Sequence, residues 1–405
     1  MRILSSSLVL LAALSGGARA NGFLLNEFDA REVGRGNAGA ATDYDPSSIY
    51  YNVGGLAGSE GTRITIGGSL IQPIASFTDA STGAKTDSNT PLQAVPGIFL
   101  SSRLNDKVAV GVGFYTPFGL AVSWPWTSTP QADVVTYESL RTYFITPSVG
   151  VNLGKGLTIG GGIDIVPATV ELQQNIFFGS DVGQAHLAGS ATGVGGRVGV
   201  MYRPEAVRKL SLGVMWRSQV NENFSGTGAF TAPMPYRAQL PPDGAIATKI
   251  ALPQSLTGGV AYRPLDALEI EADVVWTNWS TFKSLDIAVP SMTIVQNKNY
   301  KDTVTARIGV EYAMPEKHLA LRAGFIYDPT PVPTTTLAAD LPDIDRYDAC
   351  VGASYQVGKY DVHLGGLWVI PQKRTTDSAP NTPEYKGTFD VQAFVLSIGV
   401  SGKIM

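Results

Sequence analysis

Most of the chain repeats one local pattern. From Thr62 onward, apolar residues alternate with small or polar residues for about ten positions, then the alternation breaks and starts again. A period of two places every second side chain on one face of an extended backbone, so each stretch is predicted to be a half-buried β-strand. In 268–276, one face carries Leu268, Ile270, Ala272, Val274 and Trp276, and the other carries Glu269, Glu271 and Asp273. We interpret the three acidic residues as lying on a wall that faces water.

Fourteen such stretches can be delimited, at about 62–76, 91–103, 107–116, 140–152, 156–172, 190–203, 208–220, 248–263, 267–279, 300–313, 318–328, 346–357, 360–371 and 387–404. The connections between them alternate in length. Very short ones, such as 104–106 and 358–359, follow even-numbered strands, whereas 117–139 and 221–247 follow odd-numbered strands. Short turns at one end, long loops at the other and an even strand number are typical of a transmembrane antiparallel β-barrel of the outer membrane.

Aromatic residues and composition support this all-β prediction. A tyrosine precedes each of four short turns and is followed 13 to 15 residues later by another aromatic: Tyr202 and Trp216, Tyr262 and Trp276, Tyr312 and Tyr327, Tyr355 and Trp368. Amphipathic rings belong at the two interfaces of a membrane, and about eight residues of tilted strand cover the apolar band between them. Only 16% of the residues are charged, whereas soluble domains average about 25%. We therefore predict that residues 61–405 form a barrel of about 14 strands.

The first sixty residues differ from the rest. Residues 1–20 have a basic start, an apolar stretch and a small-x-small end at Ala18-Arg19-Ala20, which predicts a cleaved secretory signal. No later apolar run is long enough for a membrane-spanning helix. Residues 21–60 are glycine-rich and irregular, and we predict that they form a hatch inside the barrel. Gly34–Gly39 matches the dinucleotide-binding G-x-G-x-x-G pattern, but no strand precedes it, so a tight turn in the hatch is the better interpretation.

Catalytic and metal-binding motifs are sparse. His186, His318 and His363 are far apart in sequence, and Cys350 is the only cysteine. We expect no enzyme activity, no catalytic residues, no metal and no cofactor. The formal net charge of −4 argues against nucleic acid as a partner. The loop 117–139 is more informative, because it concentrates apolar and aromatic residues where a loop normally faces water. Its capture residues are predicted to be Phe118, Leu120, Trp124 and Trp126.

Several segments in order resemble the FadL-type family of outer-membrane transporters for long-chain fatty acids and other hydrophobic compounds. The segments are Gly22-Phe23-Leu24-Leu25-Asn26-Glu27-Phe28, Gly34-Arg35-Gly36, Leu252-Pro253, Trp276-Thr277-Asn278-Trp279-Ser280-Thr281-Phe282, Arg307-Ile308-Gly309-Val310-Glu311-Tyr312, and Leu321-Arg322-Ala323-Gly324-Phe325-Ile326-Tyr327-Asp328 with its continuation to Arg346. Together they span the mature chain.

The resemblance implies passive uptake of a hydrophobic small molecule through a plugged barrel embedded in outer-membrane lipid. Ligand would be captured among the loops, would reach an inner pocket closed by Phe23, Leu24, Leu25 and Phe28, and would leave sideways at a kinked third strand. The gate residues would be Asn52, Gly111, Gly113 and Phe114. The family's hatch usually carries Asn-Pro-Ala, whereas this chain has Asn52-Val53-Gly54, which leaves the gate contact open.

A carboxylate ligand also needs a cation, and Arg141, Lys298 and Arg322 are the candidates by position and charge. The sequence does not separate fatty acids from alkanes or aromatic hydrocarbons. Two other functions remain as alternatives. One is a general diffusion porin for small polar solutes, and the other is an outer-membrane lipid hydrolase, which would need a Ser–His pair on one wall. We expect a monomer.

Overall fold

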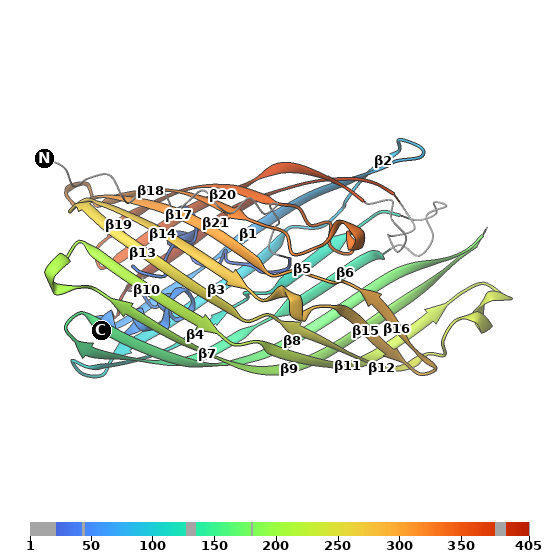
Figure 1. Ribbon diagram of the computed structural model, residues 1–405, viewed down its shortest axis with the longest axis horizontal. Helices are drawn as coiled ribbons and strands as arrows, with labels where there is room; N and C mark the ends of the chain where they lie inside the picture. Colours follow the sequence, from blue (N-terminus) through green and yellow to red (C-terminus); the bar gives the residue numbers. More distant parts are fainter. Residues whose placement is uncertain (1–21, 43–44, 127–134, 180, 377–385, 405) are drawn as a thin grey trace, which may run out of the picture.

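Fourteen antiparallel strands close into a barrel in the computed structural model, which describes residues 22–42, 45–126, 135–179, 181–376 and 386–404 (Figure 1). In ring order they are β1 (Thr62–Asp79), β3 (Gln93–Arg103), β4 (Val108–Tyr115), β7 (Phe144–Gly154), β8 (Leu157–Phe178), β9 (Asp181–Tyr202), β10 (Leu210–Arg217), β13 (Ser255–Leu265), β14 (Leu268–Thr277), β17 (Thr303–Met314), β18 (Leu319–Asp328), β19 (Arg346–Val357), β20 (Tyr360–Thr375) and β21 (Gly387–Lys403). Strand β21 pairs with β1 from Arg63↔Lys403 to Asp79↔Gly387, which closes the ring. The predicted barrel and its fourteen strands are confirmed. The predicted signal, residues 1–20, lies outside the described residues.

The alternation of apolar and polar residues along each strand places apolar side chains on the outer face of the barrel wall and polar ones on its lumen face. On β14 and its partner β17, Val274 and Ile308 are exposed on the outer surface, while Asp273 and Arg307 are buried on the lumen side. The tyrosines before the short turns follow the same rule, because Tyr202, Tyr262, Tyr312 and Tyr355 are all at least 40% exposed. A strand that alternates apolar-out with polar-in can only be satisfied between lipid and a polar interior.

Seven further strands extend the wall at the end that carries the long connections. They are β2 (Lys85–Asp87), β5 (Gly119–Ser123), β6 (Val135–Thr142), β11 (Val220–Thr231), β12 (Gly244–Leu252), β15 (Ser284–Val289) and β16 (Met292–Asn297). Strands β11 and β12 pair with each other, as do β15 and β16, and both hairpins project beyond the barrel (Figure 1). The expectation that 117–139 and 221–247 are loops was therefore wrong, because both contain strands. Their backbone groups are paired in ladders, so these long segments keep their hydrogen bonds beyond the barrel wall.

Short helices hold the N-terminal segment inside the barrel. They are α1 (Ala30–Gly34), α2 (Ser48–Tyr51) and the 3₁₀ helix η1 (Val53–Gly58), and the remaining 3₁₀ turns lie in connections: η2 (Glu205–Val207), η3 (Tyr236–Gln239), η4 (Trp279–Thr281), η5 (Pro315–Lys317) and η6 (Thr334–Thr336). Helix α1 contacts β18, β19, β20 and β21, whereas η1 contacts β4, β7, β8 and β9. The hatch segment, which we define as the described residues from Gly22 to Ser59, thus touches opposite walls of the lumen. No helix in the described residues is long and apolar enough to span a membrane.

Glycines on the lumen face make this close fit possible. A Cβ at Gly97 would overlap the carbonyl of Phe28, and one at Gly213 would overlap the carbonyl of Ala40. The same holds for Gly160 against Val53. These wall positions carry no side chain because the hatch backbone occupies the space where one would be.

The third strand is interrupted. Strand β4 ends at Tyr115, which pairs with Gly97 of β3, and β5 begins at Gly119. The β4–β7 and β5–β6 ladders differ in register by one residue across this break. Above Gly97, strand β3 continues its ladder with β1 but, within the described residues, forms no ladder with β5. The wall therefore changes partner at residues 116–118.

Candidate ligand path and hatch contacts

The start of the hatch segment fills a cluster of aromatic rings in the lumen. The ring centroid of Phe23 lies 4.7 Å from that of Trp279, 5.9 Å from Phe282 and 6.1 Å from Phe118, all in edge contacts. Trp279 is fully buried, and Phe144 and Tyr300 complete the cluster. Trp279 and Phe282 were not among the predicted site residues, although both belong to the W-x-x-W-x-x-F segment that carries the family resemblance.

A two-residue antiparallel bridge joins the hatch segment to the broken third strand. Leu24 is the bridge partner of Phe118. The amide of Leu25 donates to the Pro117 carbonyl at 2.8 Å, and the amide of Gly119 donates to the Phe23 carbonyl at 3.0 Å. The segment that leaves the wall at 116–118 is thus paired with the N-terminal chain instead of with β3. Phe118 and Leu24 are 6% and 4% exposed.

The four residues predicted to close the inner pocket lie in two different places. Leu25 packs against Gly119 beside the bridge. Phe28 lies further along the hatch, with its ring centroid 4.3 Å from Tyr50 and 5.3 Å from Tyr115, and it is fully buried. Phe23, Leu24 and Leu25 therefore border the third-strand break, whereas Phe28 is part of the packing between hatch and wall.

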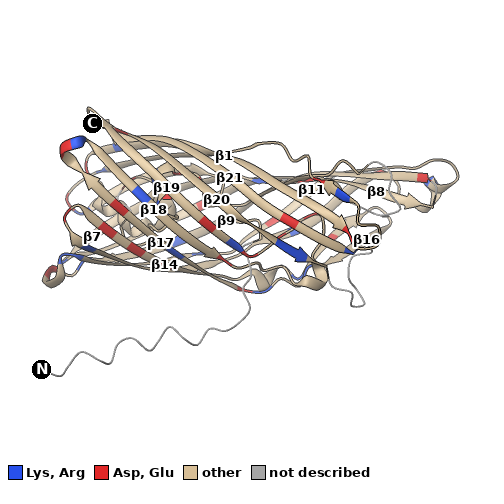
Figure 2. Cartoon of the chain, turned by 90° about the horizontal axis from the view of Figure 1, so that it is seen from above, with Lys and Arg blue, Asp and Glu red and all other residues tan. Residues whose placement is uncertain are grey.

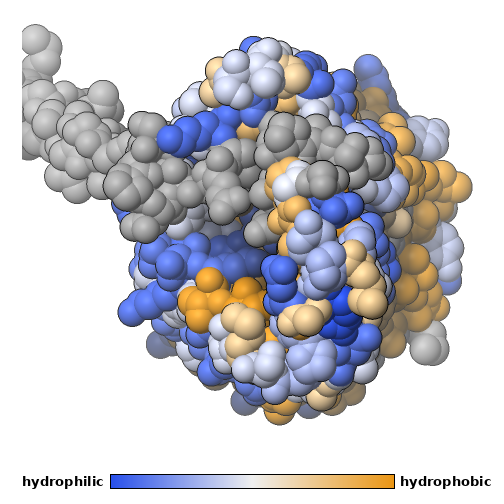
Figure 3. Space-filling view, turned by 90° about the vertical axis from the view of Figure 1, so that its right-hand side faces the viewer, coloured by the Kyte–Doolittle hydropathy of each residue, from blue (hydrophilic) through white to orange (hydrophobic). Residues whose placement is uncertain are grey.

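Of the predicted capture residues, the two tryptophans lie at the loop end of the barrel. Trp124 and Trp126 stack with their centroids 4.6 Å apart, and the Trp124 indole donates to the Ala339 carbonyl at 3.0 Å. They line an open groove of about 540 Å³ together with Pro125, Thr136, Asn175, Val182, Gln184, Thr231, Ala232 and Pro233. Figure 3 shows this end of the molecule, where a hydrophobic patch lies beside a hollow within a mostly hydrophilic rim. Phe118 is in the inner cluster instead, and Leu120 is partly buried against the same apolar core.

The three predicted head-group cations differ in their surroundings. Arg141 is exposed on β6 between the buried Leu140 and Thr142, so it lies on the outer face of the wall. Lys298 is ion-paired with Asp340 in the loops. Burial lowers the pKa of the Lys298 ammonium, but the carboxylates of Asp340 and Glu138 outweigh this and raise it. Lys298 thus remains charged and already has an anionic partner.

Arg322 is buried near the turn end of the lumen. Its guanidinium lies 2.6 Å from Glu311 and also donates to Ser354. It lines a polar cavity of about 340 Å³ with Arg31, Thr42, Asp45, Arg263, Glu311, Ala313, Pro315, His318, Leu319, Ala320, Ser354, Gln356, Asp361 and His363. None of the three cations therefore lies in the aromatic cluster around Phe23.

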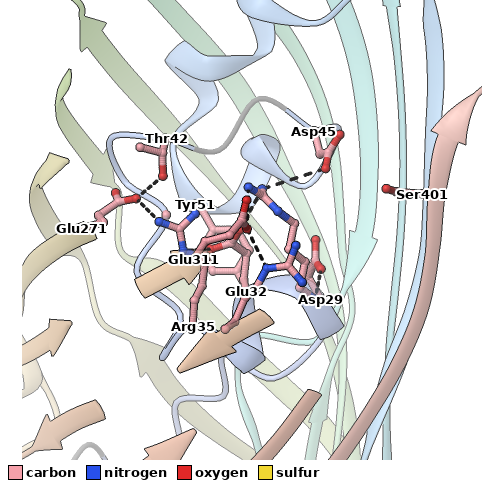
Figure 4. A network of polar contacts seen from close by, with 12 residues as sticks. Asp29, Glu32, Arg35, Thr42, Asp45, Tyr51, Glu271, Glu311 and Ser401 are labelled. Atoms are coloured by element: carbon pink, nitrogen blue, oxygen red, sulfur yellow. Dashed lines mark hydrogen bonds and ion pairs between the residues drawn. The ribbon is translucent and has the colours of Figure 1, made fainter. Parts of the chain in front are cut away.

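The acidic face of β14 does not look onto water, contrary to the sequence interpretation. Arg35 of the hatch lies 2.9 Å from Glu271 and 3.3 Å from Glu269, and Thr42 also donates to Glu271 (Figure 4). Asp273 accepts hydrogen bonds from the amides of Gly39 and Ala40. The carboxylates compensate the hatch arginine and the unpaired amides that follow α1. Figure 2 shows such charged positions as isolated segments along otherwise uncharged strands.

This network also explains the G-x-G-x-x-G pattern. Helix α1 ends at Gly34, and Gly36 and Asn37 both adopt positive φ, at 71° and 54°. The resulting tight turn directs the following amides to Asp273. The predicted turn in the hatch fits these angles. The anion that its amides bind is the Asp273 carboxylate of the barrel wall, not a nucleotide phosphate.

The predicted gate residues lie on two sides of the hatch. The Asn52 amide donates to the carbonyls of Ala40 and Val200, and its Oδ1 accepts from the Gly54 amide. Asn52 therefore contacts β9 and not the third strand, with which it was expected to form the gate. The third strand contacts other residues of the hatch segment instead. A Cβ on Gly111 would touch Ile49 and Leu56.

The other two third-strand positions pack against aromatic rings. Gly113 lies beside the rings of Phe99 and Tyr115. Phe114 stacks on Tyr143, with the ring centroids 5.8 Å apart.

One histidine does lie beside serines on a single wall. His363 Nδ1 is hydrogen-bonded to Ser354, and its Nε2 lies 2.9 Å from Ser401, across strands β19, β20 and β21. Ser354 also accepts from Arg322, so the group is a polar ladder across three strands that borders the cavity lined by Arg322. Among the described residues, no three His, Cys, Asp or Glu side chains are grouped as ligands for a metal ion.

These features define an outer-membrane β-barrel whose lumen holds its own N-terminal segment. A family model described as "Outer membrane protein transport protein (OMPP1/FadL/TodX)" matches residues 11–403. The chain belongs to this family, which confirms the resemblance in the sequence, and it is an outer-membrane transport protein. It is 23% identical over 420 residues to the long-chain fatty acid transport protein of Salmonella typhi, covering 95% of each chain. It is 24% identical over 426 residues to outer membrane protein P1 of Haemophilus influenzae, covering 91% of this chain and 90% of that one.

Solved structures share the fold at low sequence identity. A Pseudomonas aeruginosa FadL homologue superposes with a TM-score of 0.85 at 18% identity, covering 95% of this chain and all of that one. The Ralstonia pickettii toluene transporter TbuX superposes with a TM-score of 0.74 at 18% identity, covering 94% of this chain and 99% of that one. One relative is thus named for fatty acids and one structural neighbour for toluene.

Proposed function

We propose that this protein mediates passive uptake of long-chain fatty acids or similar hydrophobic small molecules across the outer membrane, gated by the hatch segment. The observation that carries the proposal is one contiguous cluster of buried apolar side chains. It includes Trp124 and Trp126 at the loop groove and also Phe23, Leu24 and Phe118 at the third-strand break. An apolar molecule gains about 25 cal/mol per Å² of apolar surface removed from water, so this cluster offers it a favourable route through the wet loop region.

The route ends where the barrel wall is interrupted. The ligand enters at the tryptophan groove and passes to the cluster around Phe23. It leaves sideways between β3 and β5, where residues 116–118 have left the wall. The Leu24–Phe118 bridge closes this position, so movement of the hatch start opens it. The relatives named for fatty acid transport and the toluene transporters with the same fold support a hydrophobic cargo.

A direct test compares hydrophobic and polar solutes in proteoliposomes. We expect specific binding and transfer of a fluorescent long-chain fatty acid or a hydrocarbon, with no swelling in small sugars. Trp126→Ala should weaken the transfer, whereas Trp368→Ala, on the lipid-facing surface at 41% exposure, should not. Rapid, size-dependent sugar permeation would instead support the general porin alternative and overturn the proposal.

A further inference from the structure

A polar hollow lies on the outer surface of the barrel, at the end that carries the long connections. Its volume is about 430 Å³, within the range of about 300–1,000 Å³ that is usual for small-molecule sites. Strands β6, β8, β9 and β11 form it, and small residues such as Ala188, Gly189 and Gly226 leave room at its floor. The polar side chains that line it include Arg141, Thr169, Glu171, Ser190 and Ser225.

Four of these polar residues form one continuous row across the wall. Arg141 of β6 is the cross-strand partner of Thr169 in β8. Thr169 is in turn the partner of Ser190 in β9, which also pairs with Ser225 in β11. All four are exposed, whereas Leu140, next to Arg141, is buried on the lumen side. Directly paired residues of neighbouring strands point to the same face, so one guanidinium and three hydroxyl groups lie side by side in the hollow.

This row lies just beyond the lipid-facing part of the wall. Ile165 of β8 pairs with Val194 of β9, and these apolar side chains are 41% and 65% exposed on the outer surface. Thr169 and Ser190 lie four residues further along the same two strands, toward the long connections. Wall positions directly beyond the apolar band face lipid headgroups, and long loops mark the extracellular side of such a barrel. The hollow therefore faces the headgroups of the outer leaflet.

The guanidinium of Arg141 is available to an anion from outside the protein. Among the described residues it has no hydrogen bond, and no carboxylate lies within 4.0 Å of it. Glu171 attracts it at longer range, but the Glu171 Oε1 already accepts from Gln173 at 3.0 Å and lies 3.0 Å from His186 Nε2. A guanidinium binds phosphate through paired, charge-assisted hydrogen bonds. The hollow thus combines an unpaired cation, hydroxyl donors and one carboxylate acceptor.

We propose that this hollow binds the phosphorylated sugar headgroup of a glycolipid in the outer leaflet. Arg141 pairs with the phosphate, and the hydroxyl groups of Thr169 and Ser190 donate to its remaining oxygens. A sugar carries several hydroxyl groups on one ring, so it donates to Glu171 while its phosphate stays on Arg141. The acyl chains of the same lipid lie against the apolar band of the wall. Because the hollow is outside the barrel, this site is separate from the proposed route of uptake through the lumen.

The test measures binding of a diphosphorylated lipid A to the purified full-length protein in detergent, by native mass spectrometry. The comparison lipids are the same lipid A without its phosphates, and phosphatidylethanolamine. We expect the wild type to bind the phosphorylated glycolipid most tightly. Arg141→Gln should weaken that binding about tenfold, as loss of a charged hydrogen bond requires, and should change binding of the phosphate-free form by less than about twofold. Arg141→Lys should retain part of the affinity.

Two further variants separate a defined site from general surface charge. Lys373→Gln removes an exposed cation on β20, 3.6 Å from Asp390, and should have no effect. Ser190→Phe fills the middle of the hollow without a change in charge, and it should weaken binding of the phosphorylated glycolipid as Arg141→Gln does. Unchanged affinity in Arg141→Gln, or equal loss for the phosphorylated and phosphate-free forms, would overturn the inference. Equal binding of phosphatidylethanolamine and lipid A by the wild type would also overturn it, since the hollow would then be a phospholipid site.

Discussion

Arg35 in the hatch and Glu271 in strand β14 form a fully buried ion pair, with 2.9 Å between Nη2 and Oε2. The residues are 236 positions apart in the chain. The pair joins the plug to the wall at a point where neither partner can reach water. Removal of one partner leaves the other charge buried, which is far more unfavourable than the loss of an exposed ion pair.

Arg35→Met should therefore loosen the hatch. We expect a loss of about 3–5 kcal/mol in the interaction of hatch and wall, seen as larger or fluctuating conductance of single barrels in planar bilayers. Arg237→Met is the matched control, because Arg237 pairs with Asp243 in an exposed loop, 3.0 Å away. Wild-type conductance in the Arg35 variant would contradict the role of this pair.

A disulfide between positions 24 and 118 should hold the first residues of the hatch segment against the broken third strand. Flanking hydrogen bonds make Leu24 and Phe118 a non-hydrogen-bonded antiparallel pair, in which Cα atoms lie about 4.5 Å apart, close enough for a disulfide. In the double variant Leu24→Cys, Phe118→Cys, we expect transfer of fatty acid to stop under oxidising conditions and to recover on reduction. Each single variant serves as a control for side-chain loss. Full transfer by the oxidised double variant would show that the bridge need not open.

Asp343, in the loop between β18 and β19, should make the stability of the folded protein depend on pH. Burial raises its pKa to about 7, although hydrogen bonds from Thr330 and from the Gly22 amide act in the opposite direction. The folded state therefore binds the proton more tightly than the unfolded state. The stability that this group contributes is present below the unfolded pKa of about 4 and is lost as the pH rises through about 7.

Thermal unfolding in detergent checks this sign. Between pH 5 and 8 the unfolding temperature of the wild type should fall more than that of Asp343→Asn, which cannot ionise. Asp286→Asn, an exposed change on β15, should leave the wild-type slope intact. An equal slope in wild type and Asp343→Asn would contradict the assignment.

A substitution at Gly213 tests whether the glycines on the lumen face are needed for the hatch segment to fit against the wall. A Cβ there would overlap the Ala40 carbonyl and lie 2.9 Å from the Asn52 amide nitrogen. Gly213→Val should destabilise the docked hatch by about 1–3 kcal/mol, as overpacking does, measured as faster protease cleavage within residues 22–59. Gly258→Val is the control, because a Cβ at Gly258, on the neighbouring strand, meets nothing within 4 Å. Similar effects of the two changes would show that the fit is not specific.

Local patterns predicted the wall well because the wall is a local structure. Period-two alternation located all fourteen wall strands, and tyrosines before short turns marked one membrane interface. The errors arose where partners are distant. Glu271 has the alternation of a residue that faces water, and only the folded chain shows that Arg35 occupies that side. Sequence also does not show on which face of a strand a cation lies, and only the fold places Arg141 on the outer face of the wall.

The sequence by itself determined a membrane barrel with long loops at one end and an N-terminal segment unlike the rest. Those properties follow from periodicity and spacing, which neighbouring residues encode. The tertiary structure decided which charges are compensated, why wall positions such as Gly97 and Gly213 lack side chains, and that Leu24 pairs with Phe118 at the broken strand. Each of these depends on two segments far apart in the chain that meet only when the barrel closes around the hatch.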